Sequence, residues 1–228
     1  MNKKIIFITQ AKGGSGKSVL AFMLAEKYAD AEILDLDDAT TTSMKQLAYR
    51  KPQKVSFLDS ETKRIDRGAF NLLFESVIRA NIELFIADLG ASVAEQLPKY
   101  FNVNGIEFVM EILEANNIRL QLICVIGGGN IFRATMEYLA ELVYSVKGSL
   151  EILVAVNGFF PLTPEQQTAL SQFVSAHQLT VTRFDLIHDK GENAMRAAES
   201  VMNEGKGLSH LGPFTAIYFR KGMEDLKI

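Results

Sequence analysis

The stretch Gln10-Ala11-Lys12-Gly13-Gly14-Ser15-Gly16-Lys17-Ser18 decides the fold of this chain. It follows the apolar run 5–9 directly, and a segment with helical spacing of its apolar residues begins at about Lys17. A Gly-rich turn between a strand and a helix points backbone N–H groups, and the positive end of the helix dipole, at one anion. This context predicts a phosphate-binding loop rather than an incidental Gly-rich turn.

Each residue type in the loop has a part in holding phosphates. The glycines allow backbone conformations that other residues avoid, Lys17 brings a full charge to the β- and γ-phosphates, and the Ser18 hydroxyl is placed to bind Mg²⁺. The residues that we expect to contact the nucleotide here are Gly13, Gly14, Ser15, Gly16, Lys17, Ser18 and Val19.

Short apolar runs alternate with longer amphipathic segments along the whole chain, which is typical of βαβ units. We therefore predict one three-layer α/β domain over residues 1–228, with a mostly parallel, twisted sheet flanked by helices. The strand-like runs are 5–9, 32–36, 55–58, 82–88, 119–126, 151–156 and 179–184. The helical patterns are 17–28, 68–80, 106–115, 131–146 and 164–177, the last opening with a capping box at Thr163.

The loop departs from the general GxxxxGK[ST] form, because Ala11 replaces the first glycine and a second lysine, Lys12, precedes the glycine pair. This KGGxGK[ST] pattern resembles the deviant phosphate loop of ParA/MinD-like ATPases. The resemblance implies ATP as ligand, Mg²⁺ as cofactor and a homodimer that encloses ATP. It also implies that Lys12 reaches the phosphates of the partner subunit, where a second cation would stabilise the transition state as an arginine finger does. A solvent-exposed lysine is the alternative.

Two carboxylate-bearing strand ends complete the expected site. The run 33–38 resembles the DxD strand end of this family, which assigns Asp37 to orienting the attacking water and to the magnesium site. The polar residues 39–43 would then form a switch loop. Asp35 is read as a buried or loop-structuring carboxylate, and Asp38 as a helix cap.

The second strand end is Leu84-Phe85-Ile86-Ala87-Asp88, which has the Walker B form. An apolar strand that ends in one carboxylate would place Asp88 beside the phosphate loop, where it binds Mg²⁺. The small residues 89–92 after it are read as a turn suited to a second switch. Ser18, Asp37 and Asp88 are thus the expected metal residues, and Lys12, Lys17 and Asp37 the expected catalytic ones.

A late strand ends at Asn157. In the family that the loop resembles, an asparagine at this place hydrogen-bonds the adenine edge, although Asn before Gly158 is also an ordinary turn. Asp185 and His188 follow the next strand, near where the family frames the base.

The composition of the chain excludes several classes of function. The net charge of −3 argues against a general nucleic-acid coat, and the single cysteine, Cys124, excludes an internal disulfide and a multi-cysteine metal site in one chain. Cys124 lies in an apolar run and is read as core. No apolar stretch is long enough to span a bilayer, so a cytoplasmic protein is expected.

Charge is unevenly distributed. The segment from Lys45 to Arg67 carries seven basic and three acidic residues, a charge of +4 on a body of −7. This basic segment is a candidate DNA contact, with an ordinary solvated surface as the alternative. The basic residues are Lys45, Arg50, Lys51, Lys54, Lys63, Arg64 and Arg67.

Two other signals have simpler explanations. Gly127-Gly128-Gly129 before Asn130 is read as a tight turn with Asn130 capping the next helix, not as a second nucleotide site. The C-terminal segment 214–228 has an apolar face, but acidic residues dilute its basic one. We therefore expect it to dock onto the body rather than bind a membrane.

Within the family, the chain looks most like the conjugal-transfer (TraL-type) and plasmid-stability (StbB-type) proteins. Ser18-Val19, the Asp88-x-Gly-Ala-Ser92 strand end and the segment from Ile112 to Gly128 carry this likeness, and the Asp-x-Pro-Pro of many partition ATPases is absent. The expected function is an ATPase switch that recruits a protein partner in mobile-element transfer, maintenance or partition. A DNA-binding partition motor and an ATP-dependent metabolic enzyme are the alternatives.

Overall fold

The computed structural model describes residues 2–38, 42–59, 61–62, 64–185, 192–224, 226 and 228. Within them, a seven-stranded sheet forms the centre of the molecule in the order β3-β2-β4-β1-β5-β6-β7, and every pairing is parallel. The strands are β1 (Lys3–Thr9), β2 (Glu32–Leu36), β3 (Gln53–Lys54), β4 (Leu84–Leu89), β5 (Ile118–Ile126), β6 (Glu151–Asn157) and β7 (Thr180–Phe184). The predicted α/β fold with a parallel sheet is confirmed.

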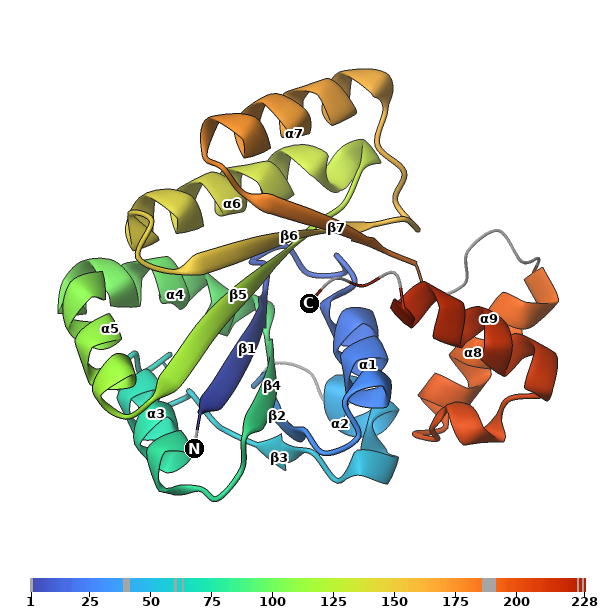
Figure 1. Ribbon diagram of the computed structural model, residues 1–228, viewed down its shortest axis with the longest axis horizontal. Helices are drawn as coiled ribbons and strands as arrows, with labels where there is room; N and C mark the ends of the chain where they lie inside the picture. Colours follow the sequence, from blue (N-terminus) through green and yellow to red (C-terminus); the bar gives the residue numbers. More distant parts are fainter. Residues whose placement is uncertain are drawn as a thin grey trace.

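Helices cover both faces of this sheet (Figure 1). The α-helices are α1 (Lys17–Lys27), α2 (Thr42–Gln46), α3 (Ala69–Arg79), α4 (Ala91–Asn104), α5 (Ile106–Ala115), α6 (Phe132–Val146), α7 (Pro164–Ala176), α8 (Glu192–Asn203) and α9 (Pro213–Glu224). Short 3₁₀ turns lie at η1 (Ala48–Arg50), η2 (Gly129–Ile131) and η3 (Leu208–His210). The capping box at Thr163 opens α7 as expected.

Alternate residues of the central strand enter two separate cores. Ile5 and Phe7 of β1 pack with α3, α4 and α6, whereas Ile6 and Ile8 pack with α1, α8 and α9. Because side chains alternate across a strand, a strand covered on both sides must be apolar at nearly every position. This explains why the strand runs could be found in the sequence without an alternating pattern.

Helix α4 was not predicted, and the reason is Pro98 in its interior. A proline has no N–H for the carbonyl four residues earlier, which here belongs to Ala94. The Tyr138 hydroxyl donates to that carbonyl instead, at 2.9 Å, and accepts from the hydroxyl of Thr9 at 2.5 Å. A buried side chain from α6 therefore supplies the donor that Pro98 lacks, and it links α4 to the last residue of β1.

We predict that Tyr138→Phe lowers the free energy of unfolding by about 2 kcal/mol, because it leaves the Ala94 carbonyl and the Thr9 hydroxyl buried without partners. Tyr144→Phe is the matched control, since Tyr144 lies on the same helix with its ring exposed. Denaturant unfolding of the two variants and the parent measures the effect. Equal losses in both variants would contradict the proposed repair of α4.

Two other predicted elements differ from the structure. The strand expected at 55–58 is instead the short β3 at Gln53–Lys54, and Leu58 forms an isolated antiparallel bridge with Ile65. The turn expected over residues 89–92 is wrong beyond Gly90, because α4 begins at Ala91.

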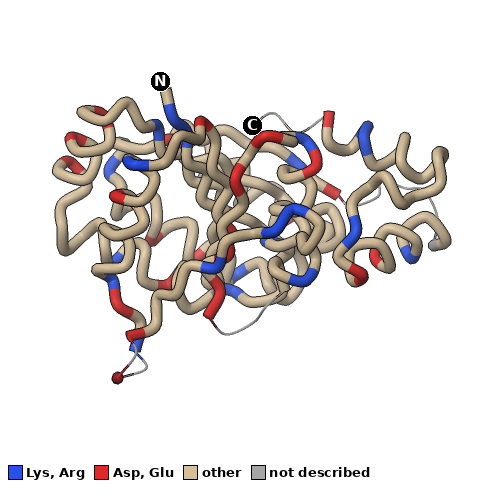
Figure 2. Tube along the Cα trace, turned by 90° about the horizontal axis from the view of Figure 1, so that it is seen from below, with Lys and Arg blue, Asp and Glu red and all other residues tan. Residues whose placement is uncertain are grey.

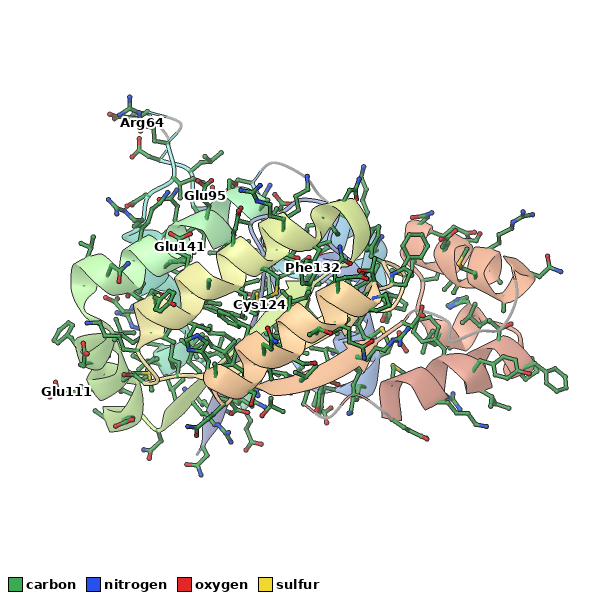
Figure 3. All side chains as sticks on the ribbon, turned by 90° about the horizontal axis from the view of Figure 1, so that it is seen from above. Arg64, Glu95, Glu111, Cys124, Phe132 and Glu141 are labelled. Atoms are coloured by element: carbon green, nitrogen blue, oxygen red, sulfur yellow. The ribbon has the colours of Figure 1, made fainter. Side chains whose placement is uncertain are left out.

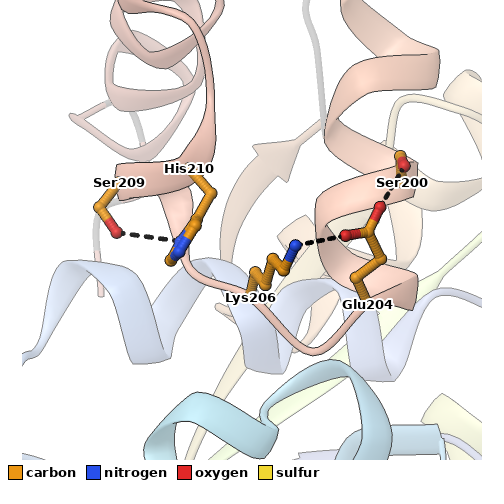
Figure 4. A network of polar contacts seen from close by, with 5 residues as sticks. All are labelled: Ser200, Glu204, Lys206, Ser209 and His210. Carbon is orange, nitrogen blue, oxygen red and sulfur yellow. Dashed lines mark hydrogen bonds and ion pairs between the residues drawn. The ribbon is translucent and has the colours of Figure 1, made fainter.

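The C-terminal helices form a unit that packs against α1 and α2. Phe219 of α9 meets Phe22 of α1 with ring centroids 5.9 Å apart, and the Leu208 N–H donates to Glu26 at 3.3 Å. Figure 4 shows how the link after α8 is held: Glu204 accepts from Ser200 at 2.8 Å and from Lys206 at 2.6 Å. The expected docking of the C-terminal segment onto the body is confirmed.

Candidate functional site

The phosphate loop lies between β1 and α1, as the sequence predicted. Gly14 and Gly16 adopt left-handed backbone conformations, with φ of 73° and 102°. A Cβ on Gly13 or Gly14 would meet nothing within 4 Å, whereas one on Gly16 would lie 2.3 Å from the Asn157 amide nitrogen. The first two glycines therefore face open space, and Gly16 lets the strand end of β6 approach the loop.

Lys17 is buried at the start of α1. Its Nζ donates to the backbone carbonyl of Gln10 at 2.9 Å, so the lysine folds back over its own loop. Burial lowers its pKa, and the nearby carboxylates of Asp88 and Asp37 oppose this shift. Because this buried ammonium group bonds a neutral carbonyl, contact with a negatively charged phosphate would stabilise its charge more strongly.

Ser18 and Asp88 meet beside the loop. The Ser18 hydroxyl donates to Asp88 Oδ2 at 2.7 Å, and Ser43 of α2 donates to the same oxygen. Asp88 is buried, and burial raises its pKa against the effect of these hydroxyls and Lys17. Its other oxygen, Oδ1, has no hydrogen-bond partner among the described residues.

This oxygen cluster fits the magnesium ion that the phosphate loop implies. Mg²⁺ prefers oxygen ligands and takes only one or two from the protein, with water and phosphate oxygens completing its shell. The Ser18 hydroxyl and the unpartnered Asp88 Oδ1 are ligands of this kind. The described residues contain no group of three or more His, Cys, Asp or Glu side chains placed to hold a metal.

The three aspartates at the end of β2 have different tasks. Asp35 is buried and accepts from the N–H groups of Asp37, at 2.9 Å, and Met44, at 3.0 Å; burial raises its pKa to about 6. Asp38 accepts from the Phe57 N–H at 2.6 Å, so it holds the segment after β3 rather than capping a helix. The loop-structuring reading of Asp35 is confirmed. Residues 39–41 of the expected switch lie outside the described residues.

Asp37 faces the phosphate loop. It lines a cavity of about 500 Å³ together with residues 13–19 and Asp88. A Cβ on Gly90 would lie 2.6 Å from the Asp37 carboxylate, so a glycine is needed where β4 leads into α4. The structure thus brings Lys17, Ser18, Asp37 and Asp88 to one cavity.

A second cavity, of about 330 Å³, adjoins the first, because Gly14, Gly16 and Val19 line both. Asn157 and Phe159 form one side of it, and residues of α8, among them Met195, form the other. The cavity therefore includes Asn157, the residue that the sequence predicts to contact the base. That α8 forms a wall of this cavity could not be predicted from the sequence.

Asn157 already uses its amide within the protein. Its Nδ2 donates to the Ser15 carbonyl at 2.8 Å, and its Oδ1 accepts from the Phe159 N–H at 3.0 Å. It therefore fastens the phosphate loop to the turn after β6, a role that the sequence did not indicate. Its expected contact with adenine stays a prediction. Asp185 lines the same cavity, and His188 lies outside the described residues.

Gln10 is a site residue that the sequence analysis missed. Its buried side chain donates to the carbonyls of Val125, at 2.8 Å, and Thr135, at 3.2 Å, and accepts from the Lys12 N–H at 3.2 Å. It anchors the start of the loop to β5 and α6. The only signal was a polar residue at the end of an apolar strand. The Lys12 side chain itself is exposed.

The basic segment is only partly available to a partner. Arg50 is half-buried and donates to carbonyls around the end of α1, among them Ala29 at 2.6 Å and Ala31 at 2.8 Å. Within this candidate DNA contact, the Arg50 guanidinium is therefore already engaged by backbone carbonyls. Arg64 lies on a loop that projects from the body (Figure 3). The other exposed basic residues of the segment are Lys45, Lys51, Lys54 and Arg67. Lys63 lies outside the described residues.

Two minor predictions have different outcomes. Cys124 is fully buried in β5, as expected. Gly128 belongs to a tight turn, since a Cβ there would lie 2.1 Å from the Pro161 carbonyl oxygen. The capping role of Asn130 is wrong, because α6 begins after Ile131 and has no side-chain cap.

Comparisons with known proteins place the fold. No protein-family model matches the chain, and no curated protein matches it. A crystal structure of a putative plasmid partition protein from Borrelia burgdorferi B31, bound to AMPPNP, matches with a TM-score of 0.50, 12% identity and 98% of both chains covered. A plasmid partition protein from Borrelia burgdorferi has a TM-score of 0.46 at 10% identity, covering 89% of this chain and 97% of that one.

The 54 kDa protein of the signal recognition particle from Aeropyrum pernix K1, in complex with GDP, has a TM-score of 0.49 at 11% identity, covering 81% of this chain and 42% of that one. Among the described residues, no helix is long and apolar enough to cross a membrane. The sheet order, the loop between β1 and α1 and the full-length match to the first of these structures agree. This chain therefore shares the fold of that putative plasmid partition protein.

Proposed function

We propose that this protein is a switch that binds ATP with Mg²⁺, hydrolyses it slowly and dimerises around it to recruit a protein partner. The observation that carries the proposal is the group formed by buried Lys17, the Ser18–Asp88 hydrogen bond and the unpartnered Asp88 Oδ1 at one cavity. The similar putative partition protein was crystallised with AMPPNP, which supports an adenine nucleotide.

Each residue of the cavity has a separate role in binding or hydrolysing ATP. Lys17 leaves the Gln10 carbonyl and neutralises the β- and γ-phosphates. Ser18 and Asp88 hold the metal, which when bound neutralises charge on the phosphate oxygens. Asp37 orients the attacking water. Lys12 is exposed and free of the cavity of its own subunit, and it supplies the second cation to the partner's phosphates.

The process served is mobile-element transfer, maintenance or partition. Support comes from the strand end Asp88-Leu89-Gly90-Ala91-Ser92, which resembles TraL-type and StbB-type proteins, and from the similarity to a putative plasmid partition protein. The experiment that tests the switch is to measure its mass in solution with ADP and with AMPPNP. Doubling of the mass with AMPPNP alone is expected, and one mass in both nucleotides would refute the switch.

A DNA-binding motor is the second candidate, and the projecting loop with Arg64 and the exposed Arg67 favours it. Figure 2 shows basic and acidic residues interspersed along the chain trace, with both kinds at the projecting loop. On this reading, the basic segment contacts DNA phosphates when ATP is bound.

For this candidate, Arg64→Ala together with Arg67→Ala should weaken ATP-dependent binding to nonspecific DNA. The slope of log affinity against log salt should fall by about 1.8, because each phosphate contact contributes about 0.9. Arg133→Ala, an exposed arginine on α6, is the control and should leave the slope unchanged. DNA binding with an unaltered slope in the double variant, or no DNA binding by the parent, would remove the basic segment as the contact.

A further inference from the structure

The Ser43 hydroxyl is a buried group of the site to which the proposed function gives no role. Ser43 lies on α2, which packs beside α1 (Figure 1), and it is 1% exposed. Its hydroxyl donates to Asp88 Oδ2, the same oxygen that accepts from Ser18 at 2.7 Å. Two hydroxyls from two different helices therefore hold one oxygen of the carboxylate that we expect to bind Mg²⁺.

The two oxygens of Asp88 differ in what they contact. Oδ2 accepts both hydrogen bonds, whereas Oδ1 is buried and has no hydrogen-bond partner among the described residues. Rotation about the Cβ–Cγ bond of Asp88 would exchange the two oxygens, and the hydrogen bonds to Oδ2 oppose this rotation. They thus keep Oδ1 available to a cation, which is the partner that a buried carboxylate oxygen without a donor requires.

The placement of Ser43 is fixed by the residues that follow it on α2. The Met44 N–H donates to Asp35 Oδ2 at 3.0 Å, and Asp35 is the register partner of Asp88 where β2 pairs with β4. The Leu47 N–H donates to the Ser43 carbonyl at 2.9 Å, and the Leu47 side chain is fully buried. Both contacts hold α2 against the strand ends, so the Ser43 hydroxyl is kept beside Asp88.

We propose that Ser43 is a positioning residue for Mg²⁺: its hydroxyl orients the Asp88 carboxylate so that Oδ1 is available to the metal. This inference rests on the proposed function, because it concerns the metal of the same site. Asp88 lines the cavity at the phosphate loop and Ser43 does not, so Ser43 acts through Asp88. Groups that orient a metal ligand in this way contribute a factor of about 10–100 to metal affinity.

The same hydrogen bond connects the metal to α2. Metal binding and the placement of α2 both depend on one orientation of the Asp88 carboxylate. Because linked equilibria act on each other equally, bound Mg²⁺ stabilises α2 in its place to the same extent that α2 supports the metal.

The affinity for a fluorescent ATP analogue, measured in excess EDTA and in excess Mg²⁺, tests the proposal. The ratio of the two dissociation constants gives the strength with which the metal supports nucleotide binding in each variant. Ser43→Ala should leave the affinity in EDTA unchanged and should lower this ratio about tenfold or more. Ser43→Thr keeps a hydroxyl and should recover most of the ratio.

Ser145→Ala is the matched control. Ser145 is 2% exposed on α6, and its hydroxyl donates to the Leu142 carbonyl at 2.7 Å, so this variant also loses one buried hydroxyl and its hydrogen bond. Both alanine variants should lose a similar amount of stability, but only Ser43→Ala should respond less to Mg²⁺. With the analogue bound, Mg²⁺ should slow hydrogen exchange of α2 in the parent and in Ser145→Ala, but not in Ser43→Ala.

The possible failures are distinguishable. A ratio in Ser43→Ala equal to that of the parent would overturn this inference alone, as would an equal loss of affinity with and without Mg²⁺, which indicates a purely structural role. A Ser43→Thr variant no better than Ser43→Ala would also contradict it. A parent protein that binds no nucleotide, or binds it without any response to Mg²⁺, would refute the proposed function and this inference together.

Discussion

Replacing Lys17 with methionine is expected to weaken ATP binding by more than about 100-fold, because a buried charge-assisted contact to phosphate contributes at least 2–3 kcal/mol. Methionine keeps the aliphatic part of the side chain and removes only the charge. In the parent protein, Lys17 exchanges its hydrogen bond to the Gln10 carbonyl for a contact with the phosphates when ATP binds. A titration with a fluorescent ATP analogue measures the affinity.

The same variant should keep or gain stability, which separates a binding defect from misfolding. Burial lowers the pKa of Lys17, so in the nucleotide-free fold the charged form carries a desolvation cost that methionine lacks. Lys54→Met, an exposed lysine, is the control for removing a positive charge. Unchanged ATP affinity in Lys17→Met would refute the assignment of this loop to phosphate binding.

The second large effect is expected for Lys12→Ala. Its side chain is exposed, and only its backbone N–H is tied to the loop, through Gln10 at 3.2 Å. ATP should bind to the variant within about threefold of the parent, whereas turnover should fall by about 10³ or more, as on loss of an arginine finger. A steady-state phosphate-release assay at saturating ATP measures turnover.

Mixing experiments give this prediction its sharpest form. If Lys12 acts across the dimer, Lys12→Ala and Lys17→Met subunits should complement each other at one of the two sites. A mixed dimer has one ATP, bound by the Lys12→Ala subunit, and the Lys17→Met subunit supplies its intact Lys12 to that ATP. Turnover should therefore reappear on mixing, up to a fraction of the parent rate. Normal turnover of Lys12→Ala alone, or no recovery on mixing, would refute the cross-dimer role.

The core of the site could be predicted from the sequence because of the order of its parts. A phosphate loop after the first strand and carboxylates at the ends of two later strands must meet in a parallel sheet, where all strands end at one edge. Lys17, Ser18, Asp37 and Asp88 meet there as expected. Local spacing and the rules of chain connection were sufficient for these residues.

The rest depends on contacts between residues far apart in the chain. Pro98 argues against a helix until Tyr138, 40 residues later, supplies the missing donor. Arg50 looks like a surface charge until α1 ends beside it and offers its carbonyls. Asn157 also fastens the phosphate loop, because its amide donates to the Ser15 carbonyl at 2.8 Å. The periodicity of the sequence does not predict these contacts, because they form only when distant segments pack together.

The measurement that tests the central claim most directly is the mass of the purified protein in solution with Mg²⁺ and either ADP or AMPPNP, at salt high enough to suppress weak surface contacts. The protein should have one mass, near 25.3 kDa, with ADP and about twice that with AMPPNP, and Lys17→Met should stay at the lower mass in both. An identical mass of the parent protein in the two nucleotides would contradict an ATP-dependent dimer.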